Sequence, residues 1–240
     1  MHHVVVEQWS RRRSFLHVRD ARAKLLVALA LLAALATAPA SPISAVPFAF
    51  LVLTGIAAAR LPMASMLRKA AVVLPFSLLF ALVEWAAGQP MAGMALLAKS
   101  YVSALTVLLL VASTPQPLLL SGMESLGAPR LLVLMAQTLY RYLFVISEQA
   151  QHMRLAASCR QGSGARRSRA RAFQAAAGAL AILFARSYSR AEGIQRAMAA
   201  RGFTGDFHSL QRRSFNSRDT VFACAGAALA VLAHLVARRP

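Results

Sequence analysis

Acidic side chains, the groups most often used for acid–base or metal chemistry, are scarce here and do not form a site. Glu124, Glu148 and Glu192 are too far apart for an acid–base pair or a metal cluster. The glycines of Gln161-Gly-Ser-Gly-Ala-Arg-Arg-Ser168 are not followed by Gly-Lys-Ser/Thr, so this stretch is not a phosphate-binding loop. The sequence therefore predicts a protein that is not an enzyme, hydrolyses no nucleotide and needs no cofactor.

Histidines and cysteines give the same answer for metals. Met1-His2-His3 could hold nickel or copper through the terminal amine and an imidazole, but we expect this end of the chain to be cytoplasmic, the wrong side to capture incoming metal. Cys224 lies in an apolar run and Cys159 in a basic stretch, so neither a disulfide nor a shared metal site is expected. We predict no metal site.

Arginine is the residue type whose distribution points to a function. The chain has 27 Lys+Arg against 8 Asp+Glu, and residues 114–219 hold fifteen arginines, no lysine and five acids. Lysine would serve solubility equally well, whereas the planar guanidinium also holds carboxylates and carbonyl oxygens in a fixed orientation. Such a charge balance fits an anionic membrane surface or a protein partner. No soluble, groove-fitting nucleic-acid-binding fold is evident, so nucleic acid is not an expected partner.

Long apolar runs must position these arginines. The hydrophobic fraction is 58%, the charged fraction 15% and the mean hydropathy +0.54, more apolar than one globular core can absorb. Spanning a bilayer takes about 20 apolar residues. The sequence thus predicts an all-α membrane protein with about five transmembrane helices, the first short unless Arg22 and Lys24 extend their charges to the membrane surface. The expected segments are 22–38, 43–59, 70–87, 91–113 and 220–237.

Loop charge predicts the orientation of these helices. Arginines and lysines precede the first helix and lie between the second and third, whereas the turns at 39–42 and 88–90 carry no charge. We therefore expect a cytoplasmic amino terminus and outward-facing neutral turns. Five crossings leave the carboxyl terminus outside, where Arg238 and Arg239 are an exception to the pattern.

The stretch between the fourth and fifth apolar helices contains two predicted amphipathic helices. Apolar residues recur every three or four positions from 131 to 154, and a second helix is expected at 173–200. These helices either lie along the inner membrane surface or form a platform for another protein, and periodicity alone favours neither. The expected organisation is a leader at 1–21, a four-helix region at 22–113, a cytoplasmic region at 114–219 and a last helix at 220–240.

Two charges lie well inside the predicted membrane segments. Glu84 and Lys99 fall on adjacent helices of one hairpin. Because isolated charges in a bilayer are unfavourable, we expect them to form a structural ion pair. An ion pathway would need more acids than these segments contain.

Three regions resemble the transmembrane T component of energy-coupling factor (ECF) transporters, in its CbiQ-like cobalt/nickel branch. Together they span most of residues 17–205, although Ala21 stands where that family usually has proline. The matching stretches are His17-Val-Arg-Asp-Ala-Arg-Ala-Lys-Leu25, Ser113-Thr-Pro115 with Leu126-Gly-Ala-Pro-Arg130 and Tyr140-Arg-Tyr-Leu-Phe144, and Leu183-Phe-Ala-Arg-Ser-Tyr-Ser-Arg-Ala-Glu192 running into Ala197-Met-Ala-Ala-Arg-Gly-Phe203.

This resemblance implies where the functional residues lie. Members of that family send two long coupling helices to a pair of ABC-type ATPases, and each helix ends in a short arginine-containing motif that sits in an ATPase groove. Ala200-Arg201-Gly202 matches the second motif. Arg160 is placed at the first, where Cys159-Arg160-Gln161-Gly162 departs from the usual tripeptide. Ala185-Arg186-Ser187 also resembles the tripeptide but falls in mid-helix.

The resemblance also implies a role. The chain would be the non-catalytic coupling subunit of an ATP-driven importer in the inner (plasma) membrane, and the expected cargo is cobalt or nickel. Its partners would be two ABC-type ATPase subunits, a substrate-binding S component and membrane lipids. The alternatives are a T component for another micronutrient such as a vitamin, or a membrane-bound protein acting on anionic lipids.

Overall fold

The computed structural model describes residues 19–160, 169–204 and 216–238. Throughout these ranges the regular structure is helical and contains no strand, so the predicted all-α class is confirmed. The chain divides into two compact units, one made of Met1–Ala128 with Leu210–Pro240 and the other of Pro129–Ser209. The first unit thus extends beyond residue 113, where sequence analysis ends the four-helix region.

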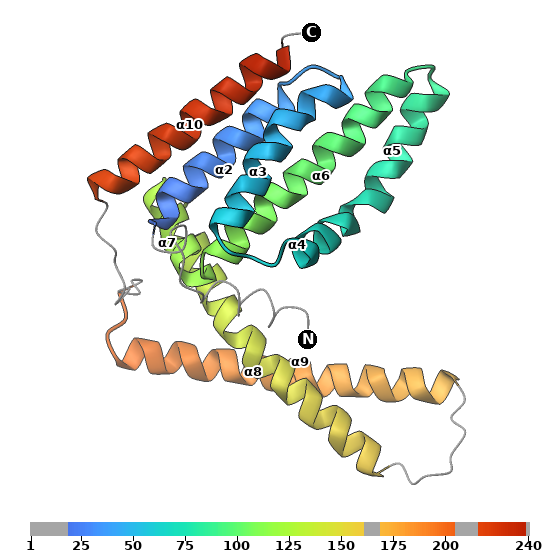
Figure 1. The fold of residues 1–240 in the computed structure, drawn as a ribbon. Coiled ribbons are helices and arrows are strands. Elements are labelled where there is room, and N and C mark those ends of the chain that lie inside the picture. Colours follow the sequence, from blue (N-terminus) through green and yellow to red (C-terminus); the bar gives the residue numbers. More distant parts are fainter. Residues whose placement is uncertain (1–18, 161–168, 205–215, 239–240) are drawn as a thin grey trace. The chain divides into compact units, whose positions relative to one another are not determined.

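The first unit is a bundle built around α6 (Figure 1). All five predicted apolar segments form helices here, and α4 and α7 are additional helices. The helix α6 packs against α2, α3, α4 and α5, while α10 packs against α2 and α3. The elements are α2 (Ala21–Ala36), η1 (Pro42–Ala45), α3 (Val46–Ala58), α4 (Met63–Ala70), η2 (Ala71–Val73), α5 (Leu74–Ala86), α6 (Pro90–Ser113), α7 (Gln116–Ser125) and α10 (Ser217–Arg238).

Prolines explain the interruptions of these helices. Pro47 and Pro75 fall within the predicted apolar segments 43–59 and 70–87, and each lies in the first turn of a new helix, α3 or α5, directly after a 3-10 turn. Proline lacks an N–H and clashes with the preceding turn, so it is tolerated only where that donor is free. The two interruptions are therefore changes from a 3-10 turn to an α-helix.

The core of this unit lies where α2, α3, α4 and α6 meet. Its largest fully buried side chains include Leu35 of α2, Phe48 and Ile56 of α3, and Met66 of α4. Large apolar side chains on the outward faces are exposed, for example Phe76 and Trp85 on α5. An apolar interior surrounded by an apolar exterior is the pattern expected of helices that face lipid.

Two glycines allow close contact between helices of the bundle. A Cβ on Gly93 of α6 would lie 2.8 Å from the backbone oxygen of Ala81 on α5. A Cβ on Gly226 of α10 would lie 2.5 Å from a methyl group of Val27 on α2. Small residues at such crossings let helix backbones approach closely in a membrane.

Four helices in the described ranges are long and apolar enough to cross a membrane, judged by length and composition. Three of them, Met63–Ala86, Pro90–Ser113 and Ser217–Arg238, match predicted spans. The fourth, Arg130–Cys159, belongs to the region predicted to be cytoplasmic. The helix Pro42–Ala58 is apolar but shorter, and α2 has 16 residues.

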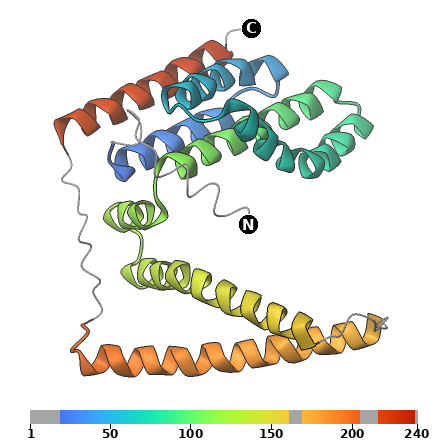
Figure 2. The ribbon, with the colours of Figure 1, turned by 60° about the horizontal axis from the view of Figure 1, so that its bottom comes forward.

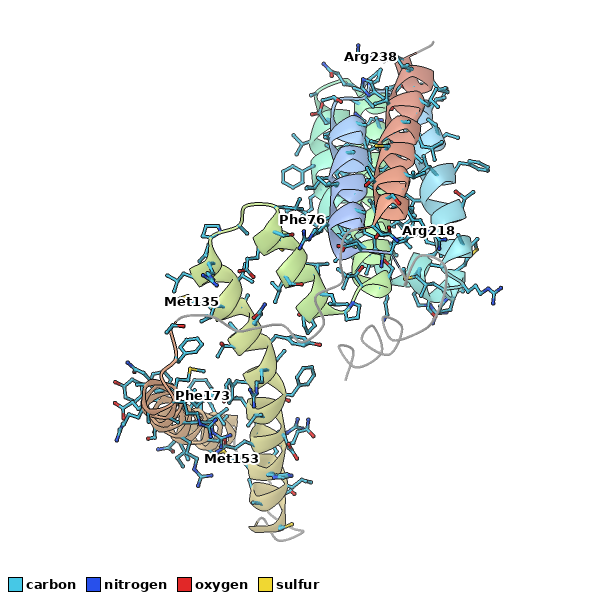
Figure 3. The ribbon with its side chains drawn as sticks, turned by 90° about the vertical axis from the view of Figure 1, so that its left-hand side faces the viewer. Phe76, Met135, Met153, Phe173, Arg218 and Arg238 are labelled. Carbon is cyan, nitrogen blue, oxygen red and sulfur yellow. The ribbon has the colours of Figure 1, made fainter. Side chains whose placement is uncertain are left out.

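The second unit consists of two long helices that pack against each other, α8 (Arg130–Arg160) and α9 (Arg169–Ala200). Figure 3 views α9 along its axis and α8 from the side, so the two helices cross. Figure 2 shows both from another direction. They correspond to the two amphipathic helices predicted at 131–154 and 173–200, and each extends further than predicted.

The substitution Gly93→Ala should destabilise the membrane unit by about 1–3 kcal/mol, because the new methyl group would press against backbone that cannot rotate away. The measurement is the free energy of unfolding of the purified protein in detergent. Gly178→Ala is the matched control, since that helical glycine has no atom within 4 Å of the position of a Cβ. This control should be neutral or stabilising by about 0.5–1 kcal/mol. Equal effects of the two substitutions would contradict the close α5–α6 contact.

Candidate functional site

A polar cluster joins the ends of three helices in the membrane unit. It involves the start of α2, the end of α6 and the start of α10, which are far apart in the sequence. The ionisable members Asp20, Lys24 and Asp219 are 6%, 5% and 8% exposed. Burial of three ionisable groups is favourable only if they are paired or hydrogen-bonded.

Asp20 and Asp219 connect the first turns of α2 and α10. The Asp20 carboxylate accepts a hydrogen bond from the backbone N–H of Arg22 at 2.9 Å and so caps α2. The backbone N–H of Asp20 donates to Asp219 Oδ1 at 3.3 Å. Arg19 approaches the same oxygen, with its Nη1 at 3.9 Å. Each carboxylate therefore lies at a helix amino terminus, where negative charge is favourable.

Lys24 caps the carboxyl-terminal end of a helix, α6. Its Nζ donates to the carbonyl oxygen of Ser113, the last residue of α6, at 3.0 Å and to Thr114 Oγ1 at 3.3 Å. The carboxyl end of a helix has unpaired carbonyls and a partial negative charge, so an ammonium group there is favourable. The sequence left open that Lys24 extends its charge to the membrane surface to lengthen the first span, whereas in the structure this side chain is buried and bound to the end of α6.

The other end of the same bundle also uses basic side chains to bind carbonyl groups. Lys99 Nζ donates to the Ala38 carbonyl oxygen at 2.6 Å, and His234 Nδ1 lies 3.0 Å from the carbonyl oxygen of Ala34. No ion pair joins Glu84 to Lys99 in the described part of the chain. The structure thus pairs Lys99 with the end of α2, a partner that loop charges and helix assignments do not reveal.

In the second unit, α9 ends in a capping motif at the predicted arginine. Gly202 has φ +69°, a left-handed conformation that glycine adopts without strain. The Gly202 N–H donates to the Ala199 oxygen at 3.0 Å, and the Phe203 N–H donates to the Met198 oxygen at 3.1 Å. These two bonds form a Schellman motif, which ends the helix sharply.

Arg201 occupies the C-cap position of this motif. Its backbone N–H donates to Ala197 and Met198, whereas its side chain is exposed. Ala200, Arg201 and Gly202 are thus held together at the end of α9, and the guanidinium complements the negative end of the helix dipole. The arrangement can present one charged fork with five N–H donors to a carboxylate or to carbonyl oxygens.

Arg160, the other predicted site residue, is the last residue of α8. The glycine-containing segment at 161–168 lies outside the described residues, as do the predicted amino-terminal leader through residue 18 and the arginines at 212 and 213. Arg160 therefore ends a helix of 31 residues, and Arg201 directly follows a helix of 32 residues.

A groove where α8 and α9 cross carries two further arginines. It has a volume of about 520 Å³ and is lined by Gln149 of α8 and by Ala185, Arg186, Ser189 and Arg190 of α9. Arg186 and Arg190 are one helical turn apart and so lie on one face. The mid-helix tripeptide at Arg186 is thus part of a basic groove, a feature that the motif alone does not indicate.

Large apolar side chains on these two helices are exposed. On α8 they include Leu132, Met135 and Leu139, and on α9 Leu180 and Phe184. Exposed apolar patches of this kind mark surfaces that contact membrane or another protein. Both interpretations left open by the periodicity remain compatible with this surface.

Apolar helices around a polar cluster, with a separate arginine-bearing pair of helices, define a polytopic helical membrane protein. No group of three or more His, Cys, Asp or Glu side chains placed to hold a metal ion occurs among the described residues. A family model described as "CbiQ: Cobalt transport protein" matches residues 12–212. The chain belongs to this family of cobalt transport proteins.

One curated relative is similar over a shorter stretch. The "Cobalt transport protein CbiQ" of Rhodobacter capsulatus is 33% identical over 104 residues, which cover 43% of this chain and 41% of the relative. The matched segment therefore spans less than half the length of that protein.

Replacing Lys24 should show how strongly the polar cluster holds the helix ends. Lys24→Met keeps the length of the side chain but leaves the Ser113 carbonyl without its charged donor, so we expect a loss of about 1.5–3 kcal/mol in the free energy of unfolding. Arg22→Met is the matched control, two positions away on α2 and half-buried, and should change stability by about 0.5 kcal/mol or less. Unfolding in detergent measures both. A loss no larger than that of the control would contradict the capping role.

Proposed function

We propose that the chain is the transmembrane coupling subunit of an ATP-driven cobalt importer of the energy-coupling factor type. In this role it hydrolyses nothing itself. Two separate ABC-type ATPase subunits close on ATP, and the chain passes their movement to a substrate-binding membrane subunit. Membership of the cobalt transport family supports the cargo class. The observation that carries the coupling role is the exposed Arg201 at the capped end of α9.

A coupling contact needs a rigid support, and the end of α9 has one. The Schellman motif fixes the backbone on both sides of Arg201, so the guanidinium projects from a defined point on a helix of 32 residues. Inserted in an ATPase groove, its fork would hold partner oxygens in one orientation. Movement of the groove would then move the whole helix. Arg160, ending α8, is the corresponding residue for the second ATPase.

The polar cluster supports a cytoplasmic position for the α8–α9 unit. Ser113 and Asp219 both lie at the cluster of Asp20 and Lys24. The helix α7, which follows Ser113 and is the last helix before the second unit, packs against α2 with Gly122 beside Ala21. The chain therefore leaves and re-enters the membrane unit at one end of the bundle. An interval that begins and ends on one face crosses the bilayer an even number of times. Of the two long helices in this interval, α8 is long and apolar enough to cross a membrane, whereas α9 is not. A crossing by α8 alone is therefore disfavoured.

Orientation follows from the charges at that end of the bundle. It carries Arg19, Asp20 and Lys24, and the arginine-rich sequence of residues 114–219 departs from it. Positively charged segments remain on the cytoplasmic side of the inner membrane. We thus assign the amino terminus and the α8–α9 unit to the cytoplasm, where the ATPases are, and the turns at 39–42 and 88–90 to the outside.

Substitutions at Arg201 test the coupling role. Arg201→Ala removes charge-assisted hydrogen bonds and should weaken ATPase binding by about 2–5 kcal/mol. Arg201→Lys should restore only part of it, because an ammonium cannot reproduce the fork. The control is Arg196→Ala on the same helix, whose side chain is 79% exposed and pairs with Glu192 at 3.2 Å. Such a surface pair contributes roughly 0–1 kcal/mol.

Co-purification of the ATPase subunits and cobalt uptake in cells are the two measurements. The coupling role predicts that both fall with Arg201→Ala and remain near wild type with Arg196→Ala. If these arginines act only on lipid, the two variants should behave alike, each losing about 1 kcal/mol of membrane attraction. Wild-type ATPase retention and uptake with Arg201→Ala would contradict the proposal. Uptake of nickel or a vitamin in place of cobalt would leave the coupling role intact and change only the cargo.

A further inference from the structure

An apolar pocket lies at the end of the membrane unit opposite the polar cluster. Its volume is about 680 Å³, within the usual range of roughly 300–1,000 Å³ for small-molecule sites. The turn after α2, the first turns of α3 and the last turn of α10 form its walls. The lining includes Pro39, Ile43, Val46, Phe50, Val236 and Arg238.

Among the described residues that line the pocket, Arg238 is the only one with a charged side chain. It is exposed, and it forms no hydrogen bond or ion pair within the described ranges. The two serines of the lining, Ser41 and Ser44, are neutral and cannot pair with its charge. The Ser44 hydroxyl donates to the carbonyls of Pro39 and Ser41. Figure 3 shows Arg238 and Arg218 at opposite ends of α10. Within the described residues, Arg238 thus lies at the edge of an apolar pocket without an anionic partner.

The position of Arg238 also departs from the charge pattern of the other loops. The remaining turns at this end, 39–42 and 88–90, are neutral, and the exceptions are Arg238, at the end of α10, and Arg239, the next residue in the sequence. Basic residues near a membrane surface are attracted to anionic lipids, and a guanidinium fork fits a phosphate group. An anionic ligand would account for an arginine at a place where loop charge does not favour one.

We propose that this pocket binds an anionic glycerophospholipid, with part of an acyl chain between η1, α3 and α10 and the phosphate on Arg238. The walls of the pocket are continuous with an apolar exterior, as Ile43 and Phe50 are 77% and 70% exposed. A second copy of this chain is a poorer occupant, because a chain with net charge +19 brings no excess of anions to Arg238. The proposal does not depend on the coupling role.

Native mass spectrometry of the full chain, purified in detergent, can test this assignment. Phosphatidylglycerol and phosphatidylcholine with identical acyl chains are added separately, and the lipid-bound fraction is measured. We expect phosphatidylglycerol to bind about fivefold more tightly than phosphatidylcholine, because this is the preference that one arginine near an anionic lipid provides. Arg238→Gln should remove this preference. Arg218→Gln, which removes the same charge at the other end of α10, should retain it.

A second variant tests the acyl-chain part of the site. Val46→Trp places a large side chain in the pocket from a residue that is already 60% exposed, so folding should be preserved, as an unchanged melting temperature would show. It should lower the binding of both lipids. Equal binding of the two lipids by wild type, or equal effects of Arg238→Gln and Arg218→Gln, would overturn the proposal. A lipid-free dimer that Val46→Trp dissociates would also overturn it, in favour of a second copy.

Discussion

Lys24 lies inside the membrane unit, and its ammonium group reaches the carbonyl of Ser113 at the end of α6. A buried ammonium must keep its hydrogen bonds, because losing them leaves an uncompensated charge away from water. Asp219 accepts the N–H of Asp20 in the same cluster, so the start of α10 is attached to the start of α2. These contacts bring together residues almost 200 positions apart. Apolar side chains alone could slide along one another, whereas these polar bonds fix which helix ends meet.

The same physical principle recurs at the end of α9, where the proposed coupling residue lies, with the opposite exposure. Helix ends leave carbonyls unpaired. Lys24 of α2 donates to the end of α6, Lys99 of α6 donates to the turn after α2, and the Gly202 Schellman motif ends α9. On α9 the cap leaves the Arg201 side chain exposed, so it can bind a partner. A rigid helix with an accessible charge at a fixed terminus is what transmission of an ATPase movement requires.

Hydrophobic periodicity and run length were sufficient to predict every long helix, because both are local properties of the sequence. The helices α4 and α7 are too short and too weakly apolar to be recognised this way. The partners of the charged side chains were harder to predict. Glu84 and Lys99 looked complementary in sequence, yet the nearest acceptor for Lys99 is a backbone carbonyl, a group that every residue carries. Tertiary contacts of this kind, and the basic groove at Arg186, depend on helix crossings that no local pattern specifies.

Thiol labelling of position 165 tests most directly whether the α8–α9 unit faces the cytoplasm. Ala165→Cys is introduced after Cys159 and Cys224 are replaced by serine and alanine, and Ala40→Cys in the same background marks the predicted outer turn. A membrane-impermeant maleimide is applied to intact cells and then to permeabilised cells. The account predicts labelling of position 40 in intact cells and of position 165 only after permeabilisation. Labelling of position 165 in intact cells would place α8 across the membrane and contradict a cytoplasmic coupling unit.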